Sequence, residues 1–368
     1  MAKVSWEKVL ILQTSFLGDT VLTLPLISEI RRRFPVKQLT VICLPVAREL
    51  LQNHPTIDEI IVDEKKGADR GIAGLRRQAA RLEGKRFTIV LSPHKSLRSA
   101  LMLSLARIPW RVGFRQSRGW FFFHQRINRD PARHDVERNL SLLEPFGVKL
   151  EDCKRELELP VVPEIQRQVA GKFRALGIDD HRPIVGINAG SVWPTKRWWP
   201  NGFASLIQLL KQRVDCQIVL FGGSDDRSVV SEVETRSGCS VINLVGNVTL
   251  RELPAAISRC DVFVTNDSGP MHVAVARKVP TVALFCATTP DLGFYPYTAN
   301  AIVLERRLDC RPCSSHGGRR CPLGTEACIR EIVPESVFQA VHRLLQSARL
   351  RDKDAAAPQS FHPEYVAA

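Results

Sequence analysis

The sequence has no apolar run long enough to cross a bilayer, although 44% of its 368 residues are hydrophobic. The polar residues 1–8 lead into the short apolar run 9–12, and no small-residue cleavage site follows, as a secretory signal would require. With 24% charged residues, the composition is typical of a soluble globular protein. We therefore expect a cytoplasmic protein, long enough for two domains.

Two cofactor patterns are also missing. The turn after the first predicted strand lacks Gly-x-Gly-x-x-Gly, which counts against a nicotinamide or flavin cofactor there. No Asp-x-Asp pair occurs in a suitable turn, because Asp179-Asp180 and Asp225-Asp226 are adjacent pairs. The second absence agrees with chemistry that needs no divalent metal ion.

The charge is strongly basic, at +14, and it is concentrated in one segment. Eight arginines between Arg107 and Arg138 are interleaved with Trp110, Trp120 and the run 121–123. Such a balance indicates an anionic partner, which could be a nucleic acid, a phosphorylated substrate or an anionic membrane surface. A solvated basic face is the alternative. No nucleic-acid-binding signature is present, so we expect no specific nucleic-acid partner.

Short β-branched runs alternate with helical stretches along the chain, which predicts an α/β fold with parallel sheets. A proline-bounded connector at 159–163 separates two such series. We predict two Rossmann-like domains facing across a cleft, residues 1–160 and 161–348, followed by a disordered tail at 349–368. Ligands of such sheets bind at the carboxyl ends of the strands, at the topological switch point.

The first polar turn, residues 13–20, directly follows the first predicted strand. Gly18 can approach a ligand closely, and Asp19 lies at the start of the next helix. An aspartate at that position can equally cap the helix, by accepting hydrogen bonds from unpaired N–H groups.

Two further turns follow strands of the second domain. Residues 188–198 carry Lys196 and Arg197 on a Gly- and Ser-containing loop, which suits a phosphate or else a solvated basic loop. Residues 264–272 place Asp267 and Ser268 as helix caps before Pro270. The N–H groups at this helix start form a potential anion site, although the segment could be only a cap and a lone His272 is usually a core residue.

Four cysteines gather near the end of the second domain, Cys310, Cys313, Cys321 and Cys328. In a cytosolic protein this grouping, which starts with Cys-x-x-Cys, favours a structural zinc site over disulfides. Reduced, unliganded thiols are the main alternative, and an iron–sulfur cluster is a weaker one.

Taken in order, these segments resemble the ADP-heptose:lipopolysaccharide heptosyltransferases of glycosyltransferase family 9, and in particular the heptosyltransferase II branch. The resemblance extends over nearly the whole chain and rests on TSFLGDTVLTLPLISEIRRRFP, HKSLRSALMLSLARIPWRVGF, NAGSVWPTKRWWP, FGGSDD, NVTLREL and TNDSGPMHVAVARKVPTVALF. The chain departs from the family pattern at residues 286–290, CATTP. The resemblance implies a GT-B fold and an inverting, metal-independent transfer of heptose from ADP-heptose to the inner core of lipopolysaccharide.

The resemblance also implies roles for individual residues. Asp19 would be the general base, and Lys196 would contact the diphosphate. The remaining donor-site positions would be Ser191, Val192, Asp225, Val248, Asp267, Ser268, Gly269 and His272. We assign the acceptor to Ser15, Gly18, Lys95, Arg98 and Arg115.

The expected partners are ADP-heptose and a lipid-linked core acceptor, with peripheral contact to the anionic inner leaflet through the arginine-rich segment. No cofactor is expected to take part in catalysis. Another nucleotide-sugar enzyme of the same fold, such as an epimerase, is one alternative function. A non-catalytic protein that binds a nucleotide sugar or nucleic acid is another.

Overall fold

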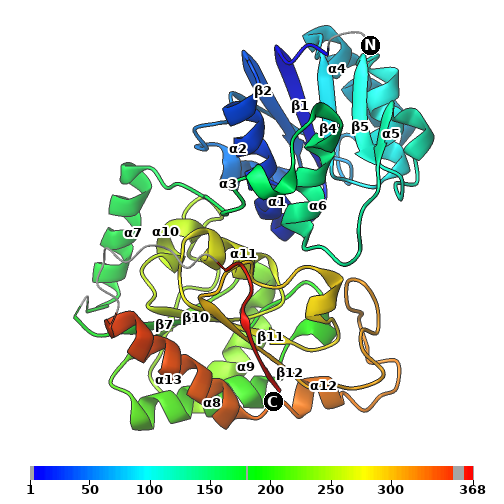
Figure 1. The fold of residues 1–368 in the computed structure, drawn as a ribbon. Coiled ribbons are helices and arrows are strands. Elements are labelled where there is room, and N and C mark those ends of the chain that lie inside the picture. The colour runs from blue at the N-terminus through cyan, green and yellow to red at the C-terminus, as the bar shows by residue number, and fades with distance from the viewer. Residues whose placement is uncertain (1–3, 180, 351–359, 368) are drawn as a thin grey trace. The chain divides into compact units, whose positions relative to one another are not determined.

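The structure is a computed structural model, and it describes residues 4–179, 181–350 and 360–367. The chain divides into two compact units, Met1–Pro160 and Val161–Ala368 (Figure 1). Among the described residues, no helix combines the length and apolar character that a membrane span requires.

The first unit is a six-stranded parallel sheet in the order β3-β2-β1-β4-β5-β6. Its strands are β1 Lys8–Gln13, β2 Gln38–Cys43, β3 Glu59–Val62, β4 Ile89–Ser92, β5 Trp110–Phe114 and β6 Gln125–Ile127. Its α-helices are α1 Leu17–Leu22, α2 Leu24–Arg33, α3 Pro45–Leu51, α4 Gly71–Lys85, α5 Leu97–Leu105 and α6 Asp135–Leu140. The short 3-10 helices are η1 Trp120–Phe122, η2 Ser141–Phe146 and η3 Leu150–Asp152.

The second unit contains a seven-stranded parallel sheet in the order β13-β12-β11-β10-β7-β8-β9. Its strands are β7 Ile184–Asn188, β8 Gln217–Phe221, β9 Ile242–Asn243, β10 Val262–Asn266, β11 Thr281–Phe285, β12 Ala301–Glu305 and β13 Glu364–Ala367. Its α-helices are α7 Pro163–Ala175, α8 Pro200–Arg213, α9 Arg227–Ser237, α10 Leu253–Ile257, α11 Gly269–Ala276, α12 Ala327–Arg330 and α13 Pro334–Leu350. The 3-10 helices are η4 Pro194–Lys196, η5 Ser224–Asp226 and η6 Pro290–Leu292.

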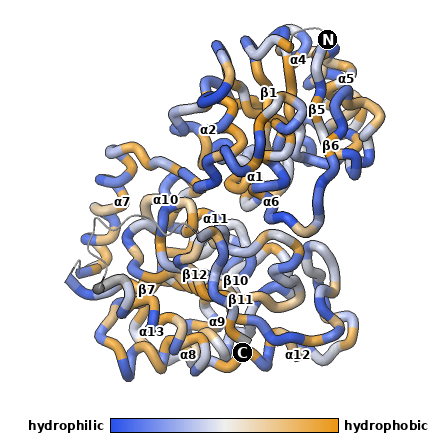
Figure 2. The backbone as a smooth tube through the Cα atoms, in the orientation of Figure 1, coloured by the Kyte–Doolittle hydropathy of each residue, from blue (hydrophilic) through white to orange (hydrophobic). Residues whose placement is uncertain are grey.

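Both sheets consist of nearly continuous apolar strands because helices cover both of their faces. Five of the six residues of β1 are buried, as are all five residues of β11. Figure 2 shows both strands as hydrophobic segments of the chain. In each unit the first strand pairs with the second on one side and with the fourth on the other, as in a Rossmann fold. The predicted α/β class with two Rossmann-like parallel sheets is therefore confirmed.

The end of the chain differs from the expectation. Glu364–Ala367 form β13, which pairs in parallel with β12, so the predicted disordered tail is wrong for this stretch. Residues 351–359, also assigned to that tail, lie outside the described residues. The sequence gives little sign of β13, because the strand depends on pairing with a segment about sixty residues earlier.

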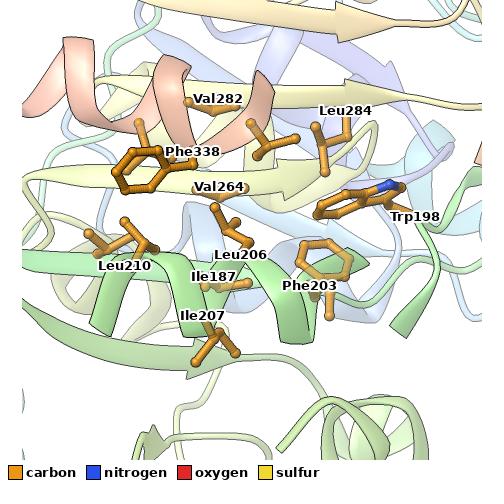
Figure 3. Close-up of a cluster of buried hydrophobic side chains, with 14 of the residues drawn as sticks. Ile187, Trp198, Phe203, Leu206, Ile207, Leu210, Val264, Val282, Leu284 and Phe338 are labelled. Atoms are coloured by element: carbon orange, nitrogen blue, oxygen red, sulfur yellow. The ribbon is translucent and has the colours of Figure 1, made fainter. Parts of the chain in front are cut away.

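The core of the second unit holds one of the predicted loops in place. Trp198 is fully buried and packs edge-on against Phe203, with ring centroids 4.9 Å apart (Figure 3). Its indole Nε1 donates to the carbonyl oxygen of Ile332, and its backbone N–H donates to the side chain of Asn266 at 2.9 Å. The loop that carries Lys196 is therefore fastened at its C-terminal end to the core and to β10.

Candidate active site

The first candidate site lies where β1 and β4 are neighbours, at the switch point of the first sheet. Asp19 is in the first turn of α1, three residues after the N-cap Phe16. Its Oδ2 accepts hydrogen bonds from the Ser15 hydroxyl and from the backbone N–H of Phe16, both at 3.1 Å. Asp19 thus caps its helix through one oxygen. Among the described residues Oδ1 has no hydrogen-bond partner, so it is available to a substrate.

The environment of Asp19 favours its protonated form. The pKa of this carboxyl group is raised to about 6, first by burial and then by the nearby charge of Asp135, against the lowering effect of the bonds from Ser15 and Phe16. Asp135 is itself buried and ion-paired with Arg129. A carboxylate with a pKa near 6 is ionised at neutral pH and is still basic enough to accept a proton.

A partly buried histidine after β4 was not predicted as part of this site. The Nδ1 of His94 lies 3.0 Å from the Thr14 hydroxyl and 2.9 Å from that of Ser99, so it joins the loops after β1 and β4. Burial lowers the pKa of His94 to about 4, and the charges of Lys65 and Lys95 lower it further. His94 is therefore neutral at physiological pH. Its signals in the sequence are its place just after a strand and its position at the start of the segment HKSLRSALMLSLARIPWRVGF, on which the family resemblance rests.

The predicted acceptor residues have different surroundings. Ser15 contacts Asp19, and Gly18 lies buried in the same helix turn. The ammonium group of Lys95 lies near Asp19 and Asp135, and its pKa is lowered first by partial burial and then by Arg129. These residues gather at the switch point, as a substrate site requires.

Arg98 and Arg115 do not join that group. Arg98 makes a two-point ion pair with the fully buried Asp63, at 2.6 and 3.1 Å, and also donates to the carbonyl oxygen of Asp69. The Arg98 guanidinium is therefore already bound to groups of the first unit. Arg115 is exposed just after β5, where its Nε donates to the carbonyl oxygen of Arg126.

The second candidate site lies between β7 and β10, at the switch point of the second sheet. Two asparagines at the strand ends join the loops. Asn188 donates to the hydroxyl groups of Thr265 (3.2 Å) and Ser268 (3.3 Å), and Asn266 donates to the carbonyl oxygens of Ala189 and Gly190. The two turns that the sequence singled out separately therefore form one structure.

At this point Lys196 and Asp267 form an ion pair, with Nζ 2.6 Å from Oδ2 and with both side chains largely buried. The same Oδ2 accepts a hydrogen bond of 2.7 Å from Thr288, which belongs to the segment that departs from the family pattern. Asp267 immediately precedes Ser268, the N-cap of α11. The ammonium group is therefore fixed close to the positive end of a helix dipole.

His272 is buried in the first turns of α11. Burial lowers its pKa to about 4; Asp267 opposes this shift and Lys196 adds to it. Its Nδ1 is buried and has no hydrogen-bond partner among the described residues. The reading of His272 as an ordinary satisfied core residue therefore does not fit, because a buried unpaired nitrogen is costly.

The other predicted donor residues follow strands of the same sheet. Ser191 is buried, and its carbonyl oxygen accepts a bond from Arg197, whereas Val192 is 72% exposed. Asp225 is exposed in η5 after β8, and Val248 is partly buried after β9. All four lie after the carboxyl ends of adjacent strands in the parallel sheet.

The cysteine-rich segment is fastened to the second candidate site. The buried guanidinium of Arg311 pairs with Glu305 at 3.0 Å and donates to the carbonyl oxygens of Phe285, Cys286 and Thr288. Gly318 exchanges hydrogen bonds with Thr195, beside Lys196. The segment thus supports the loops that hold the ion pair.

The four cysteines lie near one another, and the pKa of Cys328 is raised first by burial and then by the thiols of Cys313, Cys321 and Cys310. Cys310 is exposed and Cys328 is buried, with Cys313 and Cys321 between these extremes. Within the described part of the chain, no three His, Cys, Asp or Glu side chains are grouped so that they could hold a metal ion. A tetrahedral zinc site, which needs four converging ligands, therefore stays a prediction.

Comparisons with known proteins agree with this geometry. Residues 75–322 match the model of glycosyltransferase family 9 (heptosyltransferase). Lipopolysaccharide heptosyltransferase 2 of Salmonella typhimurium is 28% identical over 354 residues, which cover 92% of this chain and 98% of that protein.

Two solved structures are similar over almost their whole length. A family 9 glycosyltransferase from Veillonella parvula superposes with a TM-score of 0.82 and 28% identity, covering 94% of this chain and 99% of its own. The ADP-heptose lps heptosyltransferase II of E. coli superposes with a TM-score of 0.76 and 26% identity, covering 93% and 99%. The predicted GT-B fold class is confirmed.

Proposed function

The chain belongs to glycosyltransferase family 9, and we propose that it transfers the heptose of ADP-heptose to the inner core of lipopolysaccharide, with inversion and without a metal ion. The observation that carries this proposal is the buried pair of Lys196 and Asp267 beside α11. A diphosphate leaving group needs compensation of its negative charge. A fixed ammonium group and a helix N-terminus supply positive charge from the protein itself.

The second unit, which carries Lys196 and Asp267, stabilises the departing ADP. Asp267 and Thr288 hold Lys196 in one position, so its charge needs no reorganisation when negative charge develops on the β-phosphate. His272 is neutral, and its buried Nδ1 is a polar group that a ligand could satisfy. A preorganised donor in this role typically contributes about 3–4 kcal/mol to transition-state stabilisation.

The first unit supplies the general base, Asp19. The free Oδ1 of Asp19 accepts the proton of the acceptor hydroxyl as that oxygen attacks the anomeric carbon. The new bond forms on the face opposite the departing ADP, so the configuration of the anomeric centre is inverted. Asp19 remains protonated after transfer and returns the proton to water.

The experiment is a transfer assay with ADP-heptose and core acceptors truncated at successive sugars. We expect one truncated acceptor to be extended, with inverted stereochemistry by NMR, and no loss of rate in the presence of EDTA. A rate that EDTA abolishes would contradict metal independence. Epimerised donor without transfer would instead favour an epimerase, and donor binding without any turnover would favour a non-catalytic protein.

A structural zinc at Cys310, Cys313, Cys321 and Cys328 stays a prediction, and no step of the reaction depends on it. Elemental analysis of protein purified without chelators would measure it. Zinc at about one ion per chain would support the site, because tetrahedral thiolate sites bind zinc tightly. A content of only a small fraction of an ion per chain would contradict it.

A further inference from the structure

We propose that the first unit docks on an anionic lipid bilayer through a surface made of Leu97, Arg118, Trp120, Phe121 and Arg126, called here the docking surface. The proposal rests on the proposed function in one respect, namely that the acceptor is lipid-linked. The argument starts from the arginine-rich segment, whose excess charge the reaction itself does not use.

The structure separates the eight arginines of that segment into two groups. Arg111 is partly buried and donates to the carbonyl oxygens of Phe122 and Ile108. Four others pair with carboxylates: Arg107, Arg129, Arg133 and Arg138. The other three, Arg115, Arg118 and Arg126, are exposed, and no carboxylate of the described residues lies within 4 Å of them. Arg115 and Arg126 each donate from Nε to one backbone carbonyl oxygen, which leaves their positive charges without an anionic partner. The interpretation of the arginine-rich segment as a solvated basic face therefore applies only to these three arginines.

One of these charges lies beside an exposed aromatic ring. Trp120 is 46% exposed and Phe121 is 53% exposed, whereas Phe123 is buried and anchors the segment. The guanidinium carbon of Arg126 lies 4.7 Å from the centroid of the Trp120 ring. Tryptophan next to cations is typical of proteins at the membrane interface, where the ring inserts between headgroups and the charge binds phosphate.

The aromatic pair is presented by a rigid support. Gly119 packs so tightly against α5 that an added Cβ would lie 2.5 Å from the Cβ of Ala100. This close approach places η1 against α5. Leu97, at the start of α5, is 46% exposed and extends the apolar area. Insertion of these side chains would therefore cost little ordering entropy.

The docking surface is connected directly to the acceptor site. The backbone N–H of Arg118 donates to the carbonyl oxygen of Lys95 at 3.1 Å, and Lys95 lies near Asp19. The segment also follows the carboxyl end of β5, at the same edge of the sheet as the switch point. A bilayer bound here would bring the sugars of a membrane-anchored acceptor to the edge that carries the base.

The test is co-sedimentation of the full chain with vesicles rich in phosphatidylglycerol and with vesicles of phosphatidylcholine alone. We expect binding to the anionic vesicles, weakened by salt. The double variant Arg118→Gln/Arg126→Gln should bind about 30-fold more weakly, at roughly fivefold per arginine. Trp120→Ser/Phe121→Ser should also lose binding. The matched controls are the exposed pairs Arg174→Gln/Arg251→Gln and Ile72→Ser/Leu176→Ser, which should bind like the wild type.

Docking is overturned if the surface variants bind vesicles as well as the controls, or if phosphatidylcholine vesicles bind equally well. It is also overturned if the wild type binds a random oligonucleotide but no vesicles, and if the surface variants lose that oligonucleotide binding. Turnover of a deacylated, water-soluble acceptor separates this proposal from the proposed function. The surface variants should keep that turnover. If the wild type lacks it while vesicle binding still depends on the docking surface, the proposed function fails and docking stands.

Discussion

The two units place an aspartate at the same kind of position, but they surround it in opposite ways. In the first unit, Asp19 is held by neutral donors, and the nearby carboxylate of Asp135 opposes its ionisation. In the second unit, Asp267 lies 2.6 Å from the ammonium group of Lys196. Both sheets have the same Rossmann order, so the fold is not the source of the difference. The neighbouring charge therefore separates a carboxyl group with a raised pKa, Asp19, from a carboxylate that is ion-paired with a cation, Asp267.

Of the substitutions that test this difference between the two aspartates, Asp19→Asn should have the largest effect on turnover. The amide keeps the hydrogen-bonding shape but cannot accept the proton, so we expect turnover to fall by about 10²–10⁴-fold. Binding of ADP-heptose, measured separately by calorimetry, should be unchanged. Asp152→Asn, at an exposed position of the same unit, is the matched control. Near-normal turnover of Asp19→Asn would remove the base from the proposed mechanism.

Lys196→Ala should come next. Loss of one preorganised donor to the leaving group is expected to lower kcat by about 10²–10³-fold. The exposed Lys211→Ala in the same unit should leave the rate unchanged. Steady-state kinetics would measure both variants, and a loss confined to KM would mean that Lys196 contributes only to ground-state binding.

The same two substitutions should change stability in opposite directions. The folded-state pKa of Asp19, about 6, lies above its ordinary value of 3.8, so the ionised carboxylate destabilises the fold at neutral pH. Asp19→Asn should therefore raise the free energy of unfolding by ~1–3 kcal/mol at about pH 8, and the gain should shrink as the pH falls towards ~4. Lys196→Ala leaves the buried carboxylate of Asp267 without its cation, so this substitution should lower the free energy of unfolding by ~3 kcal/mol. Urea unfolding would measure the free energy of unfolding of both variants. If both substitutions changed it in the same direction, the two aspartates would not have the opposite electrostatic surroundings described here.

The smallest expected effect is on the pH dependence of kcat/KM. Protonation of Asp19 should produce an acidic limb near pH 6, below which activity falls. Asp135→Asn removes a like charge, so the pKa of Asp19 should decrease and the limb should move to lower pH. Asp130→Asn, which removes an exposed partner of Arg133, serves as the control. A limb that stays in place would mean that Asp135 does not act on Asp19.

Local patterns were sufficient to predict which turns carry the candidate site. Asp19, Lys196 and Asp267 each follow a strand, and the carboxyl ends of parallel strands share one edge. The partners of these residues were not predictable in this way. Asp135, His94 and Thr288 come from distant segments, and Arg98, assigned to the acceptor, is bound by the buried Asp63. Their contacts depend on packing across more than twenty residues of sequence.

By itself, the sequence determined the α/β class, the two parallel sheets and the polar turns of the candidate site, since hydrophobic periodicity and turn residues act over short distances. Only the tertiary structure decided which aspartate is ion-paired and which has a raised pKa. It also decided which arginines of residues 107–138 are exposed without a carboxylate partner among the described residues. The physical reason is that electrostatic interactions depend on distance in space and on burial, and both of these arise when segments far apart along the chain pack together.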